Sequence, residues 1–172
     1  LLETIKLLNM NNKDITYVFH STKEYSSSIQ THISKSELIN CEVISDDKIK
    51  SHILSKSIFA IAKSGTVSLE ISNLKIPSII LYKMNFINFL ILKMLVKTKF
   101  ANIINIAAKK EIIPELLQGE CNPKNISNKT INFLDNPDRM EEQIKETQLI
   151  LKGLKNTNSS AYQAGLSLNK FL

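Results

Sequence analysis

The residues whose types and spacing could do chemistry form a short turn, Lys63-Ser64-Gly65-Thr66. The apolar run IFAIA before it is typical of a buried strand, and VSLEISNL after it has the period of a helix. A helix start leaves backbone N–H groups unpaired and carries partial positive charge, and a glycine lets an anion approach closely. We therefore expect a phosphate site contacted by Ser64 and Thr66. An ordinary strand-to-helix turn with Thr66 as N-cap explains the same residues.

Glu70 lies four residues after Thr66, which places both on one face of the expected helix. A carboxylate there can accept hydrogen bonds from the vicinal hydroxyls of a ribose, as carboxylates do in dinucleotide-binding folds. The alternative is a solvated glutamate that only complements the helix dipole. The histidines, His20, His32 and His52, stand at unrelated spacings, and we interpret each as structural. No residue is assigned a catalytic role.

Strands and helices alternate around this turn. Apolar, β-branched runs predict strands at 15–19, 41–44, 58–62 and 78–82, and helical periods predict helices at 23–33, 46–55, 67–73 and 86–96. This order predicts an α/β fold with a parallel sheet flanked by helices, which binds ligands at the carboxyl ends of its strands.

The second half of the chain is expected to be mostly helical. Helices are predicted at 114–118, 123–134 and 137–154, with prolines near their first turns. Residues 155–160 have the composition of a linker, and 161–172 form a final amphipathic segment. We therefore expect one domain over residues 1–154, followed by the linker and amphipathic segment over residues 155–172.

The composition fits one ordinary globular domain. The chain has 172 residues, of which 43% are hydrophobic and 22% charged. No run approaches the ~20 apolar residues of a membrane span and no signal-peptide pattern occurs, so we expect a cytoplasmic protein. Cys41 and Cys121 are isolated from other metal-ligating residues, so the sequence predicts no zinc site and no disulfide.

The chain is basic, with a net charge of +6 from 22 Lys plus Arg against 16 Asp plus Glu. Only Arg139 is an arginine, and Ile, Lys and Asn are abundant, so an AT-rich genome explains the charge as well as a selected basic surface does. Aromatic residues make up 6% and do not alternate with basic ones, so nucleic acid is not an expected partner.

The segment from FAIAKSGT to GECNP resembles, nearly without gaps, the C-terminal domain of the lipid-A-disaccharide synthase family. That family has the pattern A-x-S-G-T-x-x-L-E, then P-x-x-x-x-Y, then L-V-K, and then P-N-x-x-x-G-R-E-x-x-P-E-L-L-Q. The chain matches it at Ser64, Gly65, Thr66, Leu69, Glu70, Pro77, Tyr82, residues 95–97, Asn105, Glu111 and residues 114–118. A weaker resemblance extends back through ITYVFHS and forward to about Leu154.

The resemblance implies the Rossmann-like C-terminal domain of a GT-B glycosyltransferase, bound to a UDP-sugar. The implied reaction is inverting transfer of 2,3-diacylglucosamine from UDP-2,3-diacylglucosamine to 2,3-diacylglucosamine 1-phosphate, without metal or other cofactor. Ser64 and Thr66 in the Gly65 turn would bind the diphosphate and Glu70 the ribose. The uridine or sugar side of the cleft would be lined by Asn105, Glu111 and Gln118.

The resemblance also implies partners and a location. The acceptor lipid belongs mainly to an N-terminal half, which in the family carries the catalytic base and a P-G-S-R phosphate loop just ahead of the position of Leu1. We therefore expect the chain to begin inside a larger protein and to be inactive alone. A homodimer, and a peripheral position on the inner face of the bacterial inner membrane, are further expectations.

Three positions depart from the family pattern. Ile104 replaces a proline, and Lys109 and Lys110 replace Gly-Arg. Lysine lacks the bidentate fork of arginine, and a glycine at position 109 would tolerate a positive φ that a lysine resists. These changes predict weaker binding of the donor.

Two other functions fit the sequence. One is a non-catalytic or decayed UDP-binding module from a split gene, which the lysine substitutions favour. The other is a different GT-B enzyme, such as a muramyl-pathway transferase or a UDP-sugar 2-epimerase, against which the Pro-Glu-Leu-Leu-Gln block argues. The segment at 86–96 is apolar on most sides and edged by lysines, so we favour packing against the sheet over contact with a bilayer.

Overall fold

The computed structural model of the chain describes residues 1–11, 14–63, 65–85 and 99–154. Its first half alternates helices and strands, as predicted. The elements are α1 (Leu2–Asn9), β1 (Tyr17–His20), α2 (Lys23–Ser34), β2 (Cys41–Ile44), α3 (Asp47–Lys56), β3 (Ala60–Lys63), α4 (Thr66–Asn73) and β4 (Ser78–Tyr82). The described chain then continues through α6 (Ile103–Ala108), β5 (Glu115–Leu117), the 3-10 helix η1 (Gln118–Glu120), α7 (Pro123–Leu134) and α8 (Pro137–Leu154).

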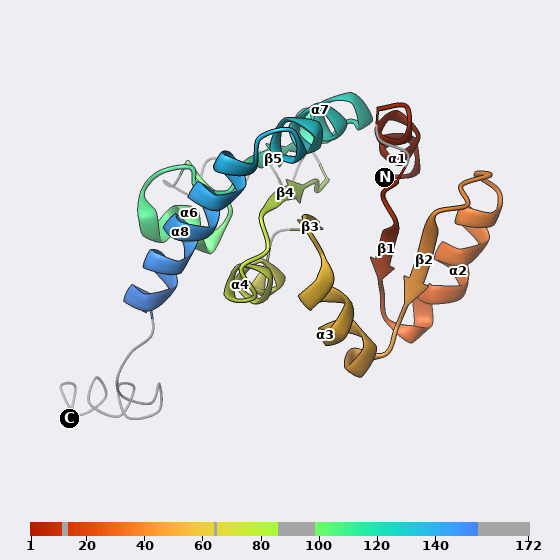
Figure 1. Cartoon of the computed structure of the whole chain (residues 1–172), viewed down its shortest axis with the longest axis horizontal. Coiled ribbons are helices and arrows are strands. Elements are labelled where there is room, and N and C mark those ends of the chain that lie inside the picture. The colour runs from red at the N-terminus through yellow and green to blue at the C-terminus, as the bar shows by residue number, and fades with distance from the viewer. Residues whose placement is uncertain (12–13, 64, 86–98, 155–172) are drawn as a thin grey trace.

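All strand pairs are parallel. Strands β1 and β2 pair with each other, and β3, β4 and β5 form a second sheet with β4 in the centre (Figure 1). Ala60 lies opposite Ser78, and Tyr82 lies opposite Leu117. Because the strands are parallel, the carboxyl ends of β3, β4 and β5 meet at one edge, where such sheets bind ligands.

Strand β4 carries the core of the second sheet on both of its faces. Ile79 and Ile80 are both 0% exposed, and neighbouring residues of a strand point to opposite faces. Ile80 packs with Ile71 of α4 and Ile104 of α6, whereas Ile79 packs with Phe133 of α7. Helices thus cover both faces, which confirms the predicted α/β arrangement, Rossmann-like in its parallel sheet and flanking helices (Figure 1).

Within residues 100–120 one sequence prediction was wrong and one helix was not predicted. Residues 114–118 were expected to be helical, but Glu115–Leu117 form β5, and the carbonyl of Pro114 accepts a hydrogen bond from the N–H of Ile80. Pairing with the buried edge of β4 outweighed the weak helical period of this short run. Helix α6 was not predicted, because its six residues are too few to display a period and only its cap, Asn102, marks its start.

Other predictions fall outside the described residues. These are the helix at 86–96, the linker at 155–160 and the amphipathic segment at 161–172.

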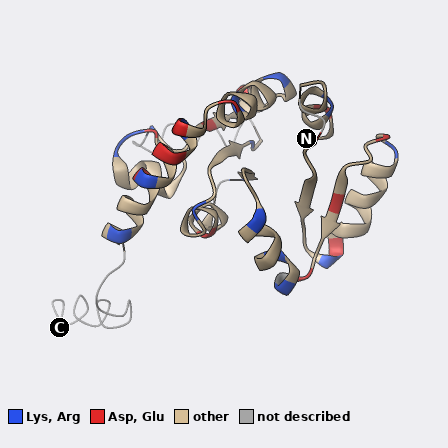
Figure 2. Cartoon of the chain, in the orientation of Figure 1, with Lys and Arg blue, Asp and Glu red and all other residues tan. Residues whose placement is uncertain are grey.

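Charged side chains are spread over the helices. Acidic and basic residues are mixed along α8, whereas α3 carries three lysines, Lys48, Lys50 and Lys56 (Figure 2). Cys41 and Cys121 are free, and burial raises the pKa of the Cys41 thiol above its ordinary value. In the described part of the chain, no helix combines the length and apolar character needed to cross a bilayer.

Candidate functional site

The turn between β3 and α4 is built around a glycine. Gly65 is the N-cap of α4 with φ 144° and ψ −163°, a conformation that residues with a side chain rarely adopt. A Cβ at this position would meet no atom within 4 Å, so the backbone conformation, rather than crowding, requires glycine. Thr66 is the first helical residue and is exposed, so the alternative of Thr66 as N-cap was wrong by one position. Ser64 lies outside the described residues.

The start of α4 keeps the properties of an anion site. Gly65 has no side chain that could cap the first N–H groups of the helix, and no acidic residue stands in the first turn. The turn is fastened from its inner side, because the buried hydroxyl of Ser68 donates a 2.7 Å hydrogen bond to the carbonyl of Gly65. A helix start whose first N–H groups have no side-chain cap can bind a phosphate.

Glu70 stands one turn further along α4 and is paired with a lysine. Its Oε2 accepts a 2.8 Å hydrogen bond from Nζ of Lys50, which lies on the neighbouring helix α3 (Figure 1). The side chain of Lys50 is 17% exposed and that of Glu70 41%. Sequence reasoning missed Lys50. The signal available was its place early in a helix that follows a strand, as Glu70 also lies early in α4.

Gln118 lies at the same edge of the sheet as the Gly65 turn, because it directly follows β5. Its side-chain Nε2 donates to the carbonyl of Met84 at 3.1 Å, and its Oε1 accepts from the N–H of Met84 at 2.9 Å. The amide thereby prolongs the β4–β5 pairing beyond Tyr82 and holds the chain that leaves β4.

Asn105 is a buried residue whose side chain hydrogen-bonds to the backbone just before β5. The residue is 0% exposed, and its Oδ1 accepts hydrogen bonds of 2.9 Å from the N–H groups of Ile112 and Ile113. Its Nδ2 donates to the carbonyl of Ile113 and to Oε1 of Glu115, both at 2.7 Å. The carboxylate of Glu115 also accepts bonds from the N–H groups of residues 101 and 102. Asn105 therefore has no donor or acceptor left for a ligand.

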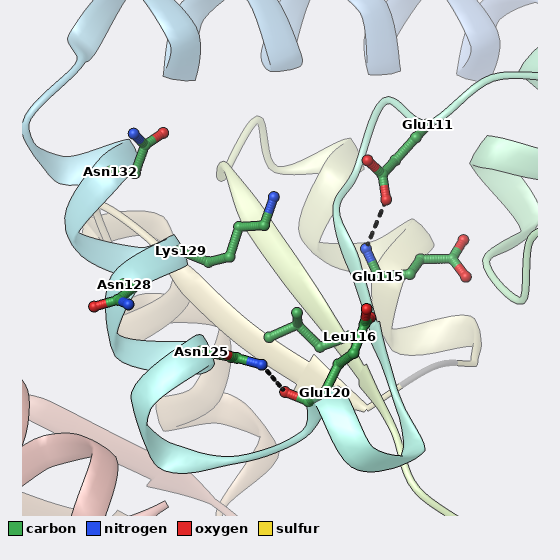
Figure 3. A pocket seen from close by; sticks show the side chains of 8 residues that line it. All are labelled: Glu111, Glu115, Leu116, Glu120, Asn125, Asn128, Lys129 and Asn132. Carbon is green, nitrogen blue, oxygen red and sulfur yellow. Dashed lines mark hydrogen bonds between the residues drawn. The ribbon is translucent and has the colours of Figure 1, made fainter.

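Glu111 lines a pocket that is separate from the Gly65 turn. Its Oε1 accepts a 3.3 Å hydrogen bond from the N–H of Glu115, beside the outer edge of β5 (Figure 3). The pocket has a volume of about 480 Å³ and lies between β5 and α7. Its described lining consists of Glu111, Glu115, Leu116, Glu120, Asn125, Asn128, Lys129 and Asn132. The structure thus brings Gly65, Thr66, Glu70 and Gln118 to one edge, whereas Asn105 and Glu111 contact the beginning of β5.

The two lysines that depart from the family pattern occupy the end of α6. Lys109 is its C-cap, with φ 56° and ψ 20°, so the expectation that this position needs a positive φ is confirmed. Lys110 forms an ion pair with Glu146 of α8. The substitutions therefore affect the junction between α6, β5 and α8 rather than the Gly65 turn.

The arrangement can bind an anion at the start of α4 beside a carboxylate that a lysine partly neutralises. Within the described residues, no group of three or more His, Cys, Asp and Glu side chains is placed to hold a metal ion.

Comparison with known proteins identifies relatives along almost the whole chain. The family model described as lipid-A-disaccharide synthetase matches residues 1–167. A lipid-A-disaccharide synthase of Rickettsia prowazekii (strain Madrid E) is 32% identical over 165 residues, which are 95% of this chain and 43% of that protein. One from Sulfurihydrogenibium sp. (strain YO3AOP1) is 31% identical over 90% of this chain and 42% of that protein. One from Rickettsia conorii (strain ATCC VR-613 / Malish 7) reaches 47% over 55% of this chain and 21% of that protein. The chain thus spans about two fifths of the length of the first two.

Proposed function

The chain belongs to the lipid-A-disaccharide synthetase family, and we propose that it is the part of such a glycosyltransferase that binds the UDP-sugar donor. The observation that carries this proposal is the junction of β3 and α4. There the family's S-G-T and E residues meet a helix start whose N-cap, Gly65, adopts φ 144°. Phosphate binding at helix starts of this kind follows from the exposed N–H groups and the helix dipole.

Each residue at this edge has a proposed role. The backbone at Gly65 and the hydroxyls of Ser64 and Thr66 bind the diphosphate of UDP-2,3-diacylglucosamine, and Glu70 accepts hydrogen bonds from the ribose. Gln118 borders the uridine or sugar through the segment that it fastens at Met84. Asn105 supports the site indirectly by ordering the start of β5, and Glu111 lines the neighbouring pocket.

The proposed reaction is displacement at the anomeric carbon of the donor. A hydroxyl oxygen of 2,3-diacylglucosamine 1-phosphate forms the new glycosidic bond while the bond to the diphosphate breaks, so the configuration inverts and UDP leaves with the electron pair. Negative charge grows on the departing diphosphate, and the positive end of α4 stabilises it. The acceptor's proton passes to a base, which the family resemblance assigns to the N-terminal half.

The proposed setting follows from the substrates. Both are acylated, so the enzyme would act as a peripheral protein at the inner face of the bacterial inner membrane. The GT-B arrangement and a homodimer are separate parts of the proposal. This chain spans about two fifths of the length of its relatives from Rickettsia prowazekii and Sulfurihydrogenibium. We propose that it needs an N-terminal half for turnover, because catalysis requires donor and acceptor to be held in one site.

A non-catalytic UDP-binding module is the second candidate, and one observation favours it. Lys109 and Lys110 replace the family's Gly-Arg pair, and Lys109 stands in a backbone conformation that suits glycine. In that case UDP would still bind, but no transfer would follow when the N-terminal half of a relative is supplied.

A reconstitution assay separates the two candidates. The 172-residue chain is incubated with both lipid substrates, first alone and then with the N-terminal half of the Rickettsia prowazekii relative, fused or added in trans. The glycosyltransferase proposal expects disaccharide only when both halves are present, with loss of product in Thr66→Val. Product from the chain alone would overturn the proposal that turnover needs an N-terminal half. Absence of product with both halves, in a preparation that binds UDP, would favour the binding module.

A further inference from the structure

We propose that Lys50 is a positioning residue of the donor site, which aims the carboxylate of Glu70 at the ribose and confers a preference for ribose over sugars that lack its hydroxyls. This inference rests on the proposed binding of UDP at the β3–α4 junction. Its basis is the 2.8 Å contact between Lys50 Nζ and Glu70 Oε2, which joins helices α3 and α4.

The exposures of the two side chains differ in a way that suits this role. Lys50 is 17% exposed and so lies largely beneath the surface, whereas Glu70 is 41% exposed and remains open to a ligand. A largely covered lysine side chain loses part of its hydration, and an anionic partner offsets that cost. Glu70 supplies that partner, so the lysine holds the carboxylate at Oε2.

The pairing leaves the carboxylate with one fixed and one available oxygen. Lys50 engages Oε2, while no described residue donates a hydrogen bond to Oε1. Because the bond at Oε2 fixes the orientation of the carboxylate, Oε1 can accept a hydrogen bond from a ligand hydroxyl without a further loss of side-chain rotational freedom, which favours binding. A carboxylate on a freely rotating side chain would gain less from the same contact.

The charge of Lys50 also reduces the repulsion between the Glu70 carboxylate and a bound diphosphate. Glu70 stands one helical turn beyond the start of α4, where the diphosphate is proposed to bind, and two negative groups at such close range repel each other. An ammonium group in contact with the carboxylate offsets this repulsion. Lys48, two residues earlier on the same helix, is exposed and is not in an ion pair with Glu70.

Two other roles for Lys50 give different expectations. If Lys50 bound the diphosphate directly, its loss would weaken every nucleoside diphosphate equally, with or without Glu70. If the pair only joined α3 to α4, its loss would lower thermal stability and leave the preference between sugars unchanged.

The test is calorimetric titration of the full 172-residue chain with UDP and with 2′,3′-dideoxy-UDP. The proteins are the wild type, Lys50→Met, Glu70→Gln and the double variant, with Lys48→Met as the matched control and Lys50→Arg as the conservative change. We expect Lys50→Met to weaken UDP about tenfold, the effect of losing one charge-assisted hydrogen bond, and to change dideoxy-UDP little. The double variant should bind UDP as weakly as Glu70→Gln alone. Lys50→Arg should keep most of the preference, and Lys48→Met should behave as wild type.

The failures are distinguishable. Equal weakening of both nucleotides by Lys50→Met, or a loss of thermal stability with an unchanged preference for UDP, would overturn the positioning role and leave the proposed function standing. Effects of Lys50→Met and Glu70→Gln that simply add would do the same, because they would show that the two residues act separately. A wild-type chain that binds no UDP would overturn the proposed function and the role of Lys50 together.

Discussion

Replacing Lys109 with glycine should stabilise the protein, although it removes a whole side chain. Lys109 ends α6 with φ 56°, in the left-handed region that favours glycine. A residue with a Cβ pays roughly 1–2 kcal/mol to adopt this conformation. Glycine also loses more backbone freedom on folding than lysine does. This entropy loss destabilises the folded variant by roughly 0.4–1 kcal/mol and offsets part of the gain. The net expectation is a gain of about 0.5–1 kcal/mol in the free energy of unfolding.

Thermal and urea unfolding measure this change. For a chain of this size a stabilisation of 1 kcal/mol raises Tm by roughly 2–4 °C, so Lys109→Gly should raise Tm by about 1–4 °C. Lys109→Ala is the control, because it removes the same charge and keeps the Cβ. Lys110→Gly is a second control, because Lys110 has no positive φ and should lose stability on the same change.

Either of two results would show that backbone strain at Lys109 does not determine the stability of this turn. One is a Lys109→Gly variant that is less stable than the wild type, which would show that lysine carries no strain at this φ. The other is an equal gain in Lys109→Ala, which would assign the effect to charge rather than to the backbone.

Two further predictions concern the same region. Asn105→Ala should lower the free energy of unfolding by about 3 kcal/mol or more, because buried N–H groups and the Glu115 carboxylate lose hydrogen-bond partners. Asn128→Ala, on the exposed side of α7, is the control and should change the free energy of unfolding little. The midpoints of urea unfolding measure this difference in stability, and similar midpoints for the two variants would contradict the structural role of Asn105. Lys109→Gly combined with Lys110→Arg should leave UDP binding in calorimetry unchanged, because both lysines lie at the junction of α6, β5 and α8 rather than at the Gly65 turn, and stronger binding would show that this junction affects the donor site.

Much of the fold could be predicted from the sequence because its signals are local. The β-branched runs gave β2 and β4 with their observed bounds, and the turn pattern at Gly65 located the junction of β3 and α4. The position of the turn could be predicted in this way, whereas the backbone conformation of Gly65, φ 144°, is known only from the structure.

What could not be predicted depends on contacts between distant parts of the chain. Strand β5 has three residues, and only its pairing with β4 distinguishes it from a helical turn. The Lys50–Glu70 pair joins two helices, α3 and α4, across 20 residues of sequence, and its formation depends on how the intervening strand β3 places them. Asn105 matches a family position in the sequence, but only the folded chain reveals that its amide is fully occupied by its neighbours.

The central claim, that the β3–α4 junction binds the nucleotide of the donor, is tested most directly by calorimetric titration of the 172-residue chain with UDP. We expect saturable binding that Glu70→Ala weakens by ~1 to 3 kcal/mol, the scale of a lost charge-assisted hydrogen-bond pair. Glu24→Ala, which removes an exposed carboxylate from α2, should leave the affinity unchanged. A wild-type chain that does not bind UDP, or an affinity that Glu70→Ala does not alter, would contradict the account.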